Sequence, residues 1–330
     1  MHKNSASLAR IRQLCHFSLP GEILIPSALQ ELTRLAPQCS AAYFWFGPDG
    51  RISNCYADRL PHGAPGEIEN HDRTMANSQF VEGVLRANHA GSTVHVDVVH
   101  DGRIKGCLST FRRMHAPPLK ECEMAAVQAG ISYVAKGLQR AEAFGRLYHD
   151  EPDTVAQEEL AVCDGEGEIL HATEGSQTLL LLSTDTPIGP LTIATAQSRA
   201  RHLLRTLCQR VLAESEIGDY RRVEETRWGR FSFKVSRLQS MDPAGRRLVA
   251  IQSRRHKPAR LHLLDVLQKA ALSERQREVA LLISMGHKNE EVAQAMKISV
   301  NTVCYHVKCL FEKLEVHSRA ELFSRFMVAP

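Results

Sequence analysis

A series of helix start signals near the C-terminal end constrains the fold of this chain more than any other feature. Ser273 and Ser318 each stand three residues before a Gln or Glu, which is the pattern of a capping box. Ser299 opens a third helical pattern in a similar way, and Asn289, a good N-cap residue, follows a glycine that is suited to end a helix. Residues 272–326 are therefore predicted to form four short helices.

The third of these helices has two contrasting faces. Its apolar residues recur at helical spacing and are expected to pack inward: Val300, Val303, Val307, Leu310 and Leu314. Four other residues form an outward, polar stripe: Asn301, Cys304, Tyr305 and Lys308. A helix held by two others, with donors facing outward and a tight turn before it, has the geometry that enters the DNA major groove. A small helical domain with a solvated face explains the same pattern.

Four motifs run through this segment without a gap. They are L-S-x-R-Q-R-E-V at Leu272–Val279, G-x-x-N-x-E-V-A at Gly286–Ala293, I-S-x-x-T-V-x-x-H-V at Ile298–Val307 and K-L-x-V-x-S-R-A-E at Lys313–Glu321. In this order they resemble the helix-turn-helix domain of the LuxR/FixJ family of bacterial transcription regulators. The resemblance implies a scaffold helix near Asn289, a recognition helix near Val300, and double-stranded DNA as the partner.

The resemblance also implies a role for individual side chains. The residues expected to face bases are Asn301, Cys304, Tyr305 and Lys308. Those expected near phosphates are Lys288, Asn289, Thr302, His306 and Lys313. The chain departs from the family at Cys304 and Glu290, where lysine is common. The family further implies a homodimer that pairs through the last helix, where the apolar residues are Leu322, Phe323 and Phe326.

The chain before this segment alternates between helical and strand patterns. Hairpins are predicted at residues 40–57 and 93–111, with a helix at 74–87 between them. A long helix follows the second hairpin and ends near residue 147. Helices around an antiparallel sheet in this order resemble a GAF domain over roughly residues 20–147, which indicates a sensor domain of the α+β class.

A second unit repeats the mixed pattern. It has a third hairpin at residues 160–172, a strong helix at 197–214 and three further strands within 223–252, an order that resembles a PAS domain. The predicted fold is therefore multidomain, with α+β units followed by an all-α four-helix domain. The expected boundaries are 1–150 for the GAF-like sensor domain, 151–256 for the PAS-like domain, and 257–330 for the linker helix and helix-turn-helix.

Candidate sites in the N-terminal half are few. His95 and Asp97 alternate onto one face of a strand, where they either point into a sensor pocket or face solvent. The nine cysteines form no C-x-x-C pair, and neither a phosphate loop nor an activated nucleophile is present. The sequence therefore predicts no enzyme activity, no cofactor and no metal site.

Charge and hydropathy add three expectations. The net charge is only +4, so DNA binding would depend on where charges lie. The basic excess falls in residues 221–260, with twelve Lys/Arg against three Asp/Glu, a net +9, and is expected to be a connector that either contacts phosphates or is merely solvated. No apolar run spans a bilayer, and charged residues interrupt the first twenty positions, so we expect no membrane association and a cytoplasmic location.

Together these features predict a one-component transcription regulator, in which sensor domains control a C-terminal helix-turn-helix. A small-molecule effector in the N-terminal half and RNA polymerase are further partners that this interpretation allows. One alternative is a sigma factor, since similar motifs occur where such factors read promoters. Another is a small-molecule hydrolase with a regulatory helical tail. The sequence identifies neither the signal nor the operator.

Overall fold

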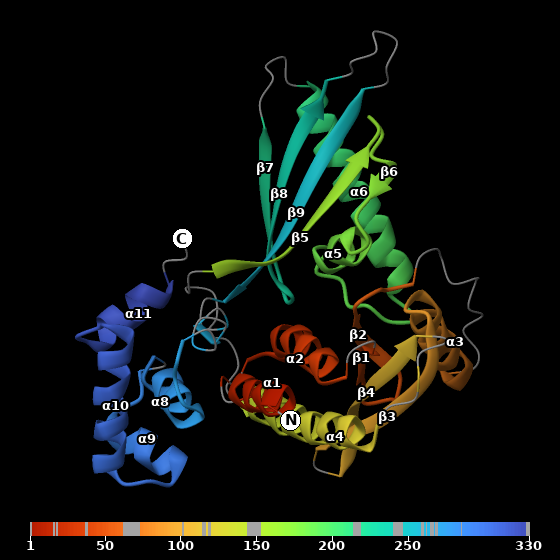
Figure 1. Cartoon of the computed structure of the whole chain (residues 1–330). Coiled ribbons are helices and arrows are strands. Elements are labelled where there is room, and N and C mark those ends of the chain that lie inside the picture. Colours follow the sequence, from red (N-terminus) through yellow and green to blue (C-terminus); the bar gives the residue numbers. More distant parts are fainter. Residues whose placement is uncertain are drawn as a thin grey trace.

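In a computed structural model, the chain forms two antiparallel sheets with flanking helices and a separate group of helices at the C-terminal end (Figure 1). The structure describes residues 2–15, 17, 19–36, 39–61, 73–100, 102–113, 117, 120–143, 153–213, 219–239, 247–258, 261, 263, 264, 267, 270–284 and 286–327. Within these residues, none of the helices combines the length and apolar character needed to cross a membrane. The predicted α+β and all-α classes are confirmed.

The first unit is a four-stranded sheet in the order β2-β1-β4-β3 with helices packed on it. Its elements are α1 (His2–Leu14), α2 (Gly21–Leu35), β1 (Cys39–Phe46), β2 (Ile52–Ala57), α3 (Arg73–Ala87), β3 (Ala90–His100), β4 (Arg103–Arg113) and α4 (Glu121–Ala143). Helices α1, α2 and α4 pack against one another. Small residues permit this packing, because a Cβ at Gly137 of α4 would lie 2.7 Å from the Cβ of Cys15.

The second unit is a five-stranded sheet in the order β6-β5-β9-β8-β7. Its elements are β5 (Asp153–Cys163), β6 (Ile169–Ala172), α5 (Ser176–Leu182), α6 (Ile193–Ala213), β7 (Tyr220–Thr226), β8 (Gly229–Leu238) and β9 (Leu248–Pro258). Inward positions alternate along β8, where Phe231, Phe233 and Val235 are buried, and α6 packs on this sheet. Alternation of this kind is the mark of a sheet with one covered face.

The basic stretch at residues 221–260 is not a connector, and that prediction is wrong. Most of its described residues belong to β7, β8 and β9. Several of its cations pair with nearby acids: Arg222 with Glu224, Arg230 with Glu225, Lys234 with Asp219, and Arg254 with Glu158. The charge excess therefore lies on a sheet. Three of these four acids lie in β7 or next to it, and the fourth, Glu158, lies in β5, which pairs with β9.

An aromatic cluster joins the two units. Trp228, in the turn between β7 and β8, is completely buried and packs edge-on against Trp45 of β1, with ring centroids 5.8 Å apart. Its ring centroid also lies 5.7 Å from that of Tyr56 in β2. The Nε of Arg255 in β9 donates to the Trp228 carbonyl at 2.9 Å. The two sheets therefore share one hydrophobic core at this junction.

The C-terminal unit consists of four short helices, as predicted: α8 (Glu274–Ser284), α9 (Asn289–Met296), α10 (Val300–Leu314) and α11 (Arg319–Met327). The capping box at Ser273 is present, because its hydroxyl accepts from the Gln276 N–H at 3.2 Å and its own N–H donates to the Gln276 side chain at 3.0 Å. Before it, the described leucines 261, 263, 264 and 267 are helical and buried.

The start of α9 differs from the prediction. Asn289 is not the N-cap, because Lys288 precedes the helix in extended backbone and donates its N–H to the Glu291 carboxylate at 2.8 Å. Asn289 uses its amide elsewhere, as described below. Helix α9 ends at Lys297, whose φ of 54° lies in the left-handed region and makes the turn into α10 tight.

Candidate nucleic-acid interface

Helix α10 is held by the inner face that the sequence predicts. Val303 and Leu310 are completely buried, and Val307 is half-buried. The covering residues come from the two preceding helices: Val279, Leu282, Ile283, Val292, Ala293 and Met296, all of them buried. Val300 is the exception, with 38% of its surface exposed, because it is the first helical residue and lies beyond the covering helices.

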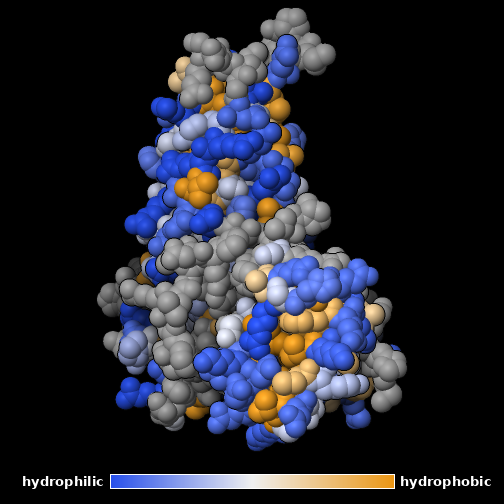
Figure 2. Space-filling model, turned by 90° about the vertical axis from the view of Figure 1, so that its left-hand side faces the viewer, coloured by the Kyte–Doolittle hydropathy of each residue, from blue (hydrophilic) through white to orange (hydrophobic). Residues whose placement is uncertain are grey.

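The outer face of α10 is polar and open. The structure places the four predicted base-facing residues on it together, all of them exposed: Asn301, Cys304, Tyr305 and Lys308. Tyr305 projects furthest, with 65% of its surface accessible. Figure 2 views the molecule from the side on which α8–α11 lie in Figure 1, and hydrophilic residues surround a small hydrophobic area in its lower part. The stripe is therefore not sealed against the sensor half.

The ionisation of Tyr305 suits hydrogen bonding. Its pKa is raised, first through a hydrogen bond with Cys309 and then through the charge of neighbouring groups. The phenol therefore stays neutral at physiological pH and is able both to donate and to accept. Its ring lies 5.8 Å from that of His306, centroid to centroid.

The residues predicted near phosphates separate into two groups. Lys288 and Thr302 are exposed, whereas Asn289 and His306 are half-buried. Lys313 differs from the prediction, because its ammonium donates to the carbonyl of Ala271 at 3.2 Å and to the Gln276 side chain at 3.1 Å. It ties the end of α10 to the start of α8, so its side chain is directed at protein groups.

Arg319 is a positioning residue that sequence reasoning missed. Its guanidinium donates to the carbonyl of His287 at 2.6 Å and to the Asn289 side-chain oxygen at 2.7 Å. The Asn289 amide in turn donates to the sulfur of Cys304 at 3.3 Å. One chain of contacts thus runs from α11 through α9 to the outer face of α10. The S-R-A-E motif contains this arginine, but only the fold shows what it contacts.

Replacing Arg319 with alanine is expected to destabilise the helical unit by about 2 kcal/mol, because hydrogen bonds to a charged group contribute on the order of 1.5–3 kcal/mol. Amide hydrogen exchange at the N-terminal ends of α9 and α11 measures this directly. Arg275→Ala is the matched control, because Arg275 is exposed and pairs with Glu278 of its own helix. Equal protection in both variants would contradict the assigned role.

The predicted dimerisation residues do not form one exposed face. Leu322 is 1% exposed and packs inside its own protomer, so its assignment to a dimer surface is wrong. The side chains of Phe323 and Phe326 lie outside the described residues. The hydroxyl of Ser318 caps α11 by accepting from the Glu321 N–H at 3.0 Å. This cap fixes where α11 begins, and Leu322, one turn later, lies on the face that packs inward.

The N-terminal half holds a different candidate site from the one predicted. His95 and Asp97 are both exposed on β3, where the His95 Nδ1 lies 2.7 Å from the Ser109 hydroxyl, so the solvent-facing alternative fits. Within the described residues, no group of three or more His, Cys, Asp or Glu side chains is placed to hold a metal ion. A cavity of about 340 Å³ opens instead between α5 and α6.

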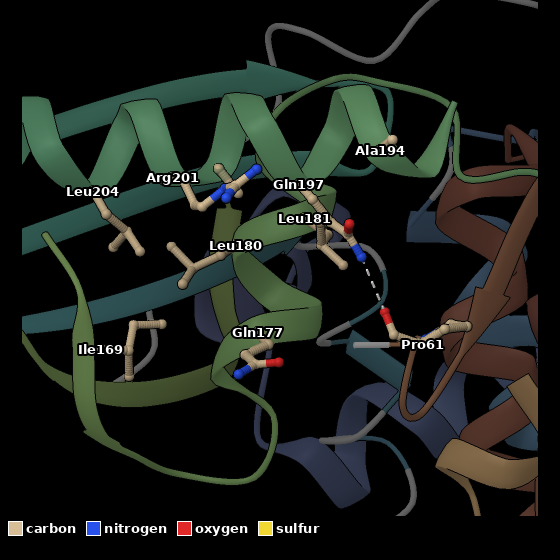
Figure 3. A pocket seen from close by; sticks show the side chains of 10 residues that line it. Pro61, Ile169, Gln177, Leu180, Leu181, Ala194, Gln197, Arg201 and Leu204 are labelled. Atoms are coloured by element: carbon tan, nitrogen blue, oxygen red, sulfur yellow. Dashed lines mark hydrogen bonds between the residues drawn. The ribbon is translucent and has the colours of Figure 1, made fainter. Parts of the chain in front are cut away.

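Figure 3 shows that this cavity is mainly apolar. Leu180, Leu181 and Leu204 line it, with Gln177 and Arg201 as polar groups. The Gln197 amide donates to the Pro61 carbonyl at 3.4 Å, so the first unit closes one end. An apolar wall with a few polar groups is the usual composition of a small-molecule pocket.

Comparison with known proteins gives a family match over the helical unit and a weaker match over more of the chain. Residues 270–326 match the family model described as bacterial regulatory proteins, luxR family. The response regulator protein VraR of Staphylococcus aureus (strain N315) is 25% identical over 204 residues, which cover 59% of this chain and 84% of VraR.

Two solved structures of VqmA from Vibrio cholerae are also similar. The dimer in the absence of target DNA is 17% identical, covers 51% of this chain and 81% of VqmA, and has a TM-score of 0.21. The complex with ligand and DNA is 14% identical, covers 53% and 87% respectively, and has a TM-score of 0.22. These scores are too low to support a conclusion. Because the family match spans the four helices just described, the chain carries a luxR-family helix-turn-helix domain at residues 270–326 and is a DNA-binding transcriptional regulator.

Proposed function

We propose that this regulator is of the one-component type, in which the two α+β units control the C-terminal helix-turn-helix. The observation that supports the DNA-binding part of this proposal most directly is the division of α10, with Val303 and Leu310 buried and the polar stripe from Asn301 to Lys308 exposed. Such a helix is able to enter the major groove while its own domain supports it from behind. Asn301, Cys304, Tyr305 and Lys308 then face bases, and Lys288 and Thr302 lie near phosphates.

Lys308→Ala tests this assignment, because a lysine that donates to a guanine contributes about 1–3 kcal/mol of discrimination. A specific site is first selected from random duplexes with the full chain, and binding of each variant is then measured on that site and on random DNA. We expect Lys308→Ala to weaken binding to the selected site, with little change on random DNA.

Lys288→Ala is the matched control for this experiment. Lys288 is exposed just before α9, and as a phosphate contact it should lower affinity for all sequences equally and reduce the slope of the salt dependence by about 1. If Lys308→Ala weakened binding to both kinds of DNA equally, Lys308 would be reassigned as a phosphate contact. Selection of no preferred sequence at all would overturn specific recognition.

The active form is proposed to be a homodimer that reads two half-sites about one DNA turn apart. The pairing surface is assigned to α11 without Leu322, which the protomer core already uses. Sedimentation of the chain with and without a two-half-site duplex tests this. A chain that stays monomeric and binds each half-site independently, whatever the spacing, would contradict it.

Two alternatives to a DNA-binding regulator are a sigma factor and a hydrolase. The chain is proposed to be a regulator without catalytic activity, and RNA polymerase is a partner only when both occupy a promoter. The luxR family match favours this over the sigma-factor alternative. Stable binding to core polymerase in the absence of DNA would revive a sigma-like role. Turnover of a small molecule by a chain lacking α8–α11 would revive the hydrolase.

A further inference from the structure

A second cavity, of about 280 Å³, lies where the first unit meets the second. One wall is a stripe of α2 that includes Ser27, Gln30 and Thr33. The opposite wall is the end of β9, with Arg255, His256 and Lys257, and the remaining lining residues are Ile23, Pro26, Tyr56, Asp58, Ala156, Gln157 and Thr178. The volume equals that of about nine water molecules in the liquid. Unlike the cavity of Figure 3, this one is lined mainly by polar side chains.

Positive charge exceeds negative charge around this cavity. Arg255 and Lys257 line it and Asp58 is the carboxylate among its lining residues. Behind Lys257, Glu31 of α2 is buried and binds two arginines, Arg10 of α1 at 3.0 Å and Arg34. Among the described residues, the lining and the Glu31 cluster behind it together hold four cations, Arg10, Arg34, Arg255 and Lys257, and two carboxylates, Asp58 and Glu31.

The pKa of Lys257 is consistent with this excess of positive charge. Burial first, and then the charges of Arg10 and Arg34, lower the pKa of Lys257 to about 8, while Glu31 opposes that change. The Nε2 of His256 lies 2.8 Å from the Ser232 hydroxyl across the strand pair.

The position of the cavity also suits a regulatory ligand. Lys257 is one residue before the end of β9, and the chain continues from there through the buried leucines 261, 263, 264 and 267 into α8. The other wall, α2, packs against α1, and Arg12 of α1 pairs with Glu278 of α8 at 2.8 Å. Both walls are therefore connected to the DNA-binding unit, one along the chain and the other through α1.

We propose that this cavity binds a small organic dianion, a phosphate ester or a dicarboxylate, between α2 and the end of β9. Lys257 and Arg255 supply the positive charge, and Gln30 and Ser27 supply hydrogen bonds to the anion. Ammonium and guanidinium groups in a half-buried site favour such oxyanions over chloride. The ligand would be the effector of the regulator, so its biological meaning rests on the proposed function. Binding itself does not involve DNA.

The test is calorimetric titration of the full chain with inorganic phosphate and, separately, with malonate, each against sodium chloride of equal ionic strength. Lys257→Gln is expected to weaken binding at least tenfold. Gln30→Glu, which places a carboxylate on an exposed position of the α2 wall, is expected to do the same without removing any buried group. Lys105→Gln is the matched control, because Lys105 is exposed on β4 and does not line the cavity.

Binding of phosphate alone assigns the site to phosphate esters, and binding of malonate alone assigns it to dicarboxylates. Either result supports the proposal if both cavity variants lose it and Lys105→Gln does not. The proposal is overturned if neither anion binds more tightly than chloride, or if Lys257→Gln and Gln30→Glu bind as the unchanged chain does. Because DNA is absent from the titration, failure here leaves the DNA-binding function to be judged by the Lys308 experiment.

Discussion

Replacing Trp228 with alanine is expected to destabilise the N-terminal half by about 3–5 kcal/mol, the usual cost of truncating a buried tryptophan. Trp228 is completely buried, and its ring contacts Trp45 and Tyr56 of the first unit although it belongs to the second. Its carbonyl also accepts from Arg255. A cavity at this position would therefore destabilise the second unit and would also weaken its packing against the first unit.

Thermal unfolding followed by calorimetry distinguishes these effects. We expect the unchanged chain to unfold both α+β units in one cooperative transition, and Trp228→Ala to separate it into two at lower temperature. Val223→Ala is the control, because Val223 lies on neighbouring β7 with 56% of its surface exposed and should change stability by less than about 0.5 kcal/mol. A single transition at an unchanged temperature for Trp228→Ala would show that the junction does not couple the units.

The helix-turn-helix was predictable from sequence because its signals are local. A capping serine is followed three residues later by the group it binds, and the apolar stripe of α10 repeats within one helix. The failures in the same unit arise where a side chain has a distant partner. Lys313 contacts Ala271 and Gln276, and Arg319 contacts Asn289, all at least thirty residues away along the chain.

The strands and helices of the N-terminal half could be predicted from the sequence, but its candidate binding site could not. Strand and turn patterns correctly placed its hairpins, since alternation and turn residues are local too. Strands were predicted within residues 223–252, but the basic excess over 221–260 was also interpreted as a connector, because composition does not show which cations are paired. Glu158 pairs with Arg254 only after β5 and β9 come together. The polar cavity combines α2 with β9, which are more than two hundred residues apart, so no sequence window contains it.

Leu310→Ala is expected to unfold the helix-turn-helix while the sensor half stays folded. Leu310 is completely buried on the inner face of α10, and removing such a side chain costs about 2–5 kcal/mol. A unit of this size has a stability on the order of 5 kcal/mol by the usual figure per residue. The loss is therefore comparable with the whole free energy of unfolding of this unit, and specific DNA binding should fall at least tenfold.

The decisive comparison is with Val300→Ala, because Val300 lies on the same helix and is also aliphatic but has 38% of its surface exposed. Hydrogen exchange of the full chain should show protection lost across α8–α11 in Leu310→Ala and kept in Val300→Ala, with the two sheets protected in both. Loss of protection in the sheets as well would mean that the helical unit folds only as part of the whole. If α10 kept its protection in Leu310→Ala, Leu310 would not be what stabilises this helix. The exposed stripe would then be positioned by contacts other than those of the inner face.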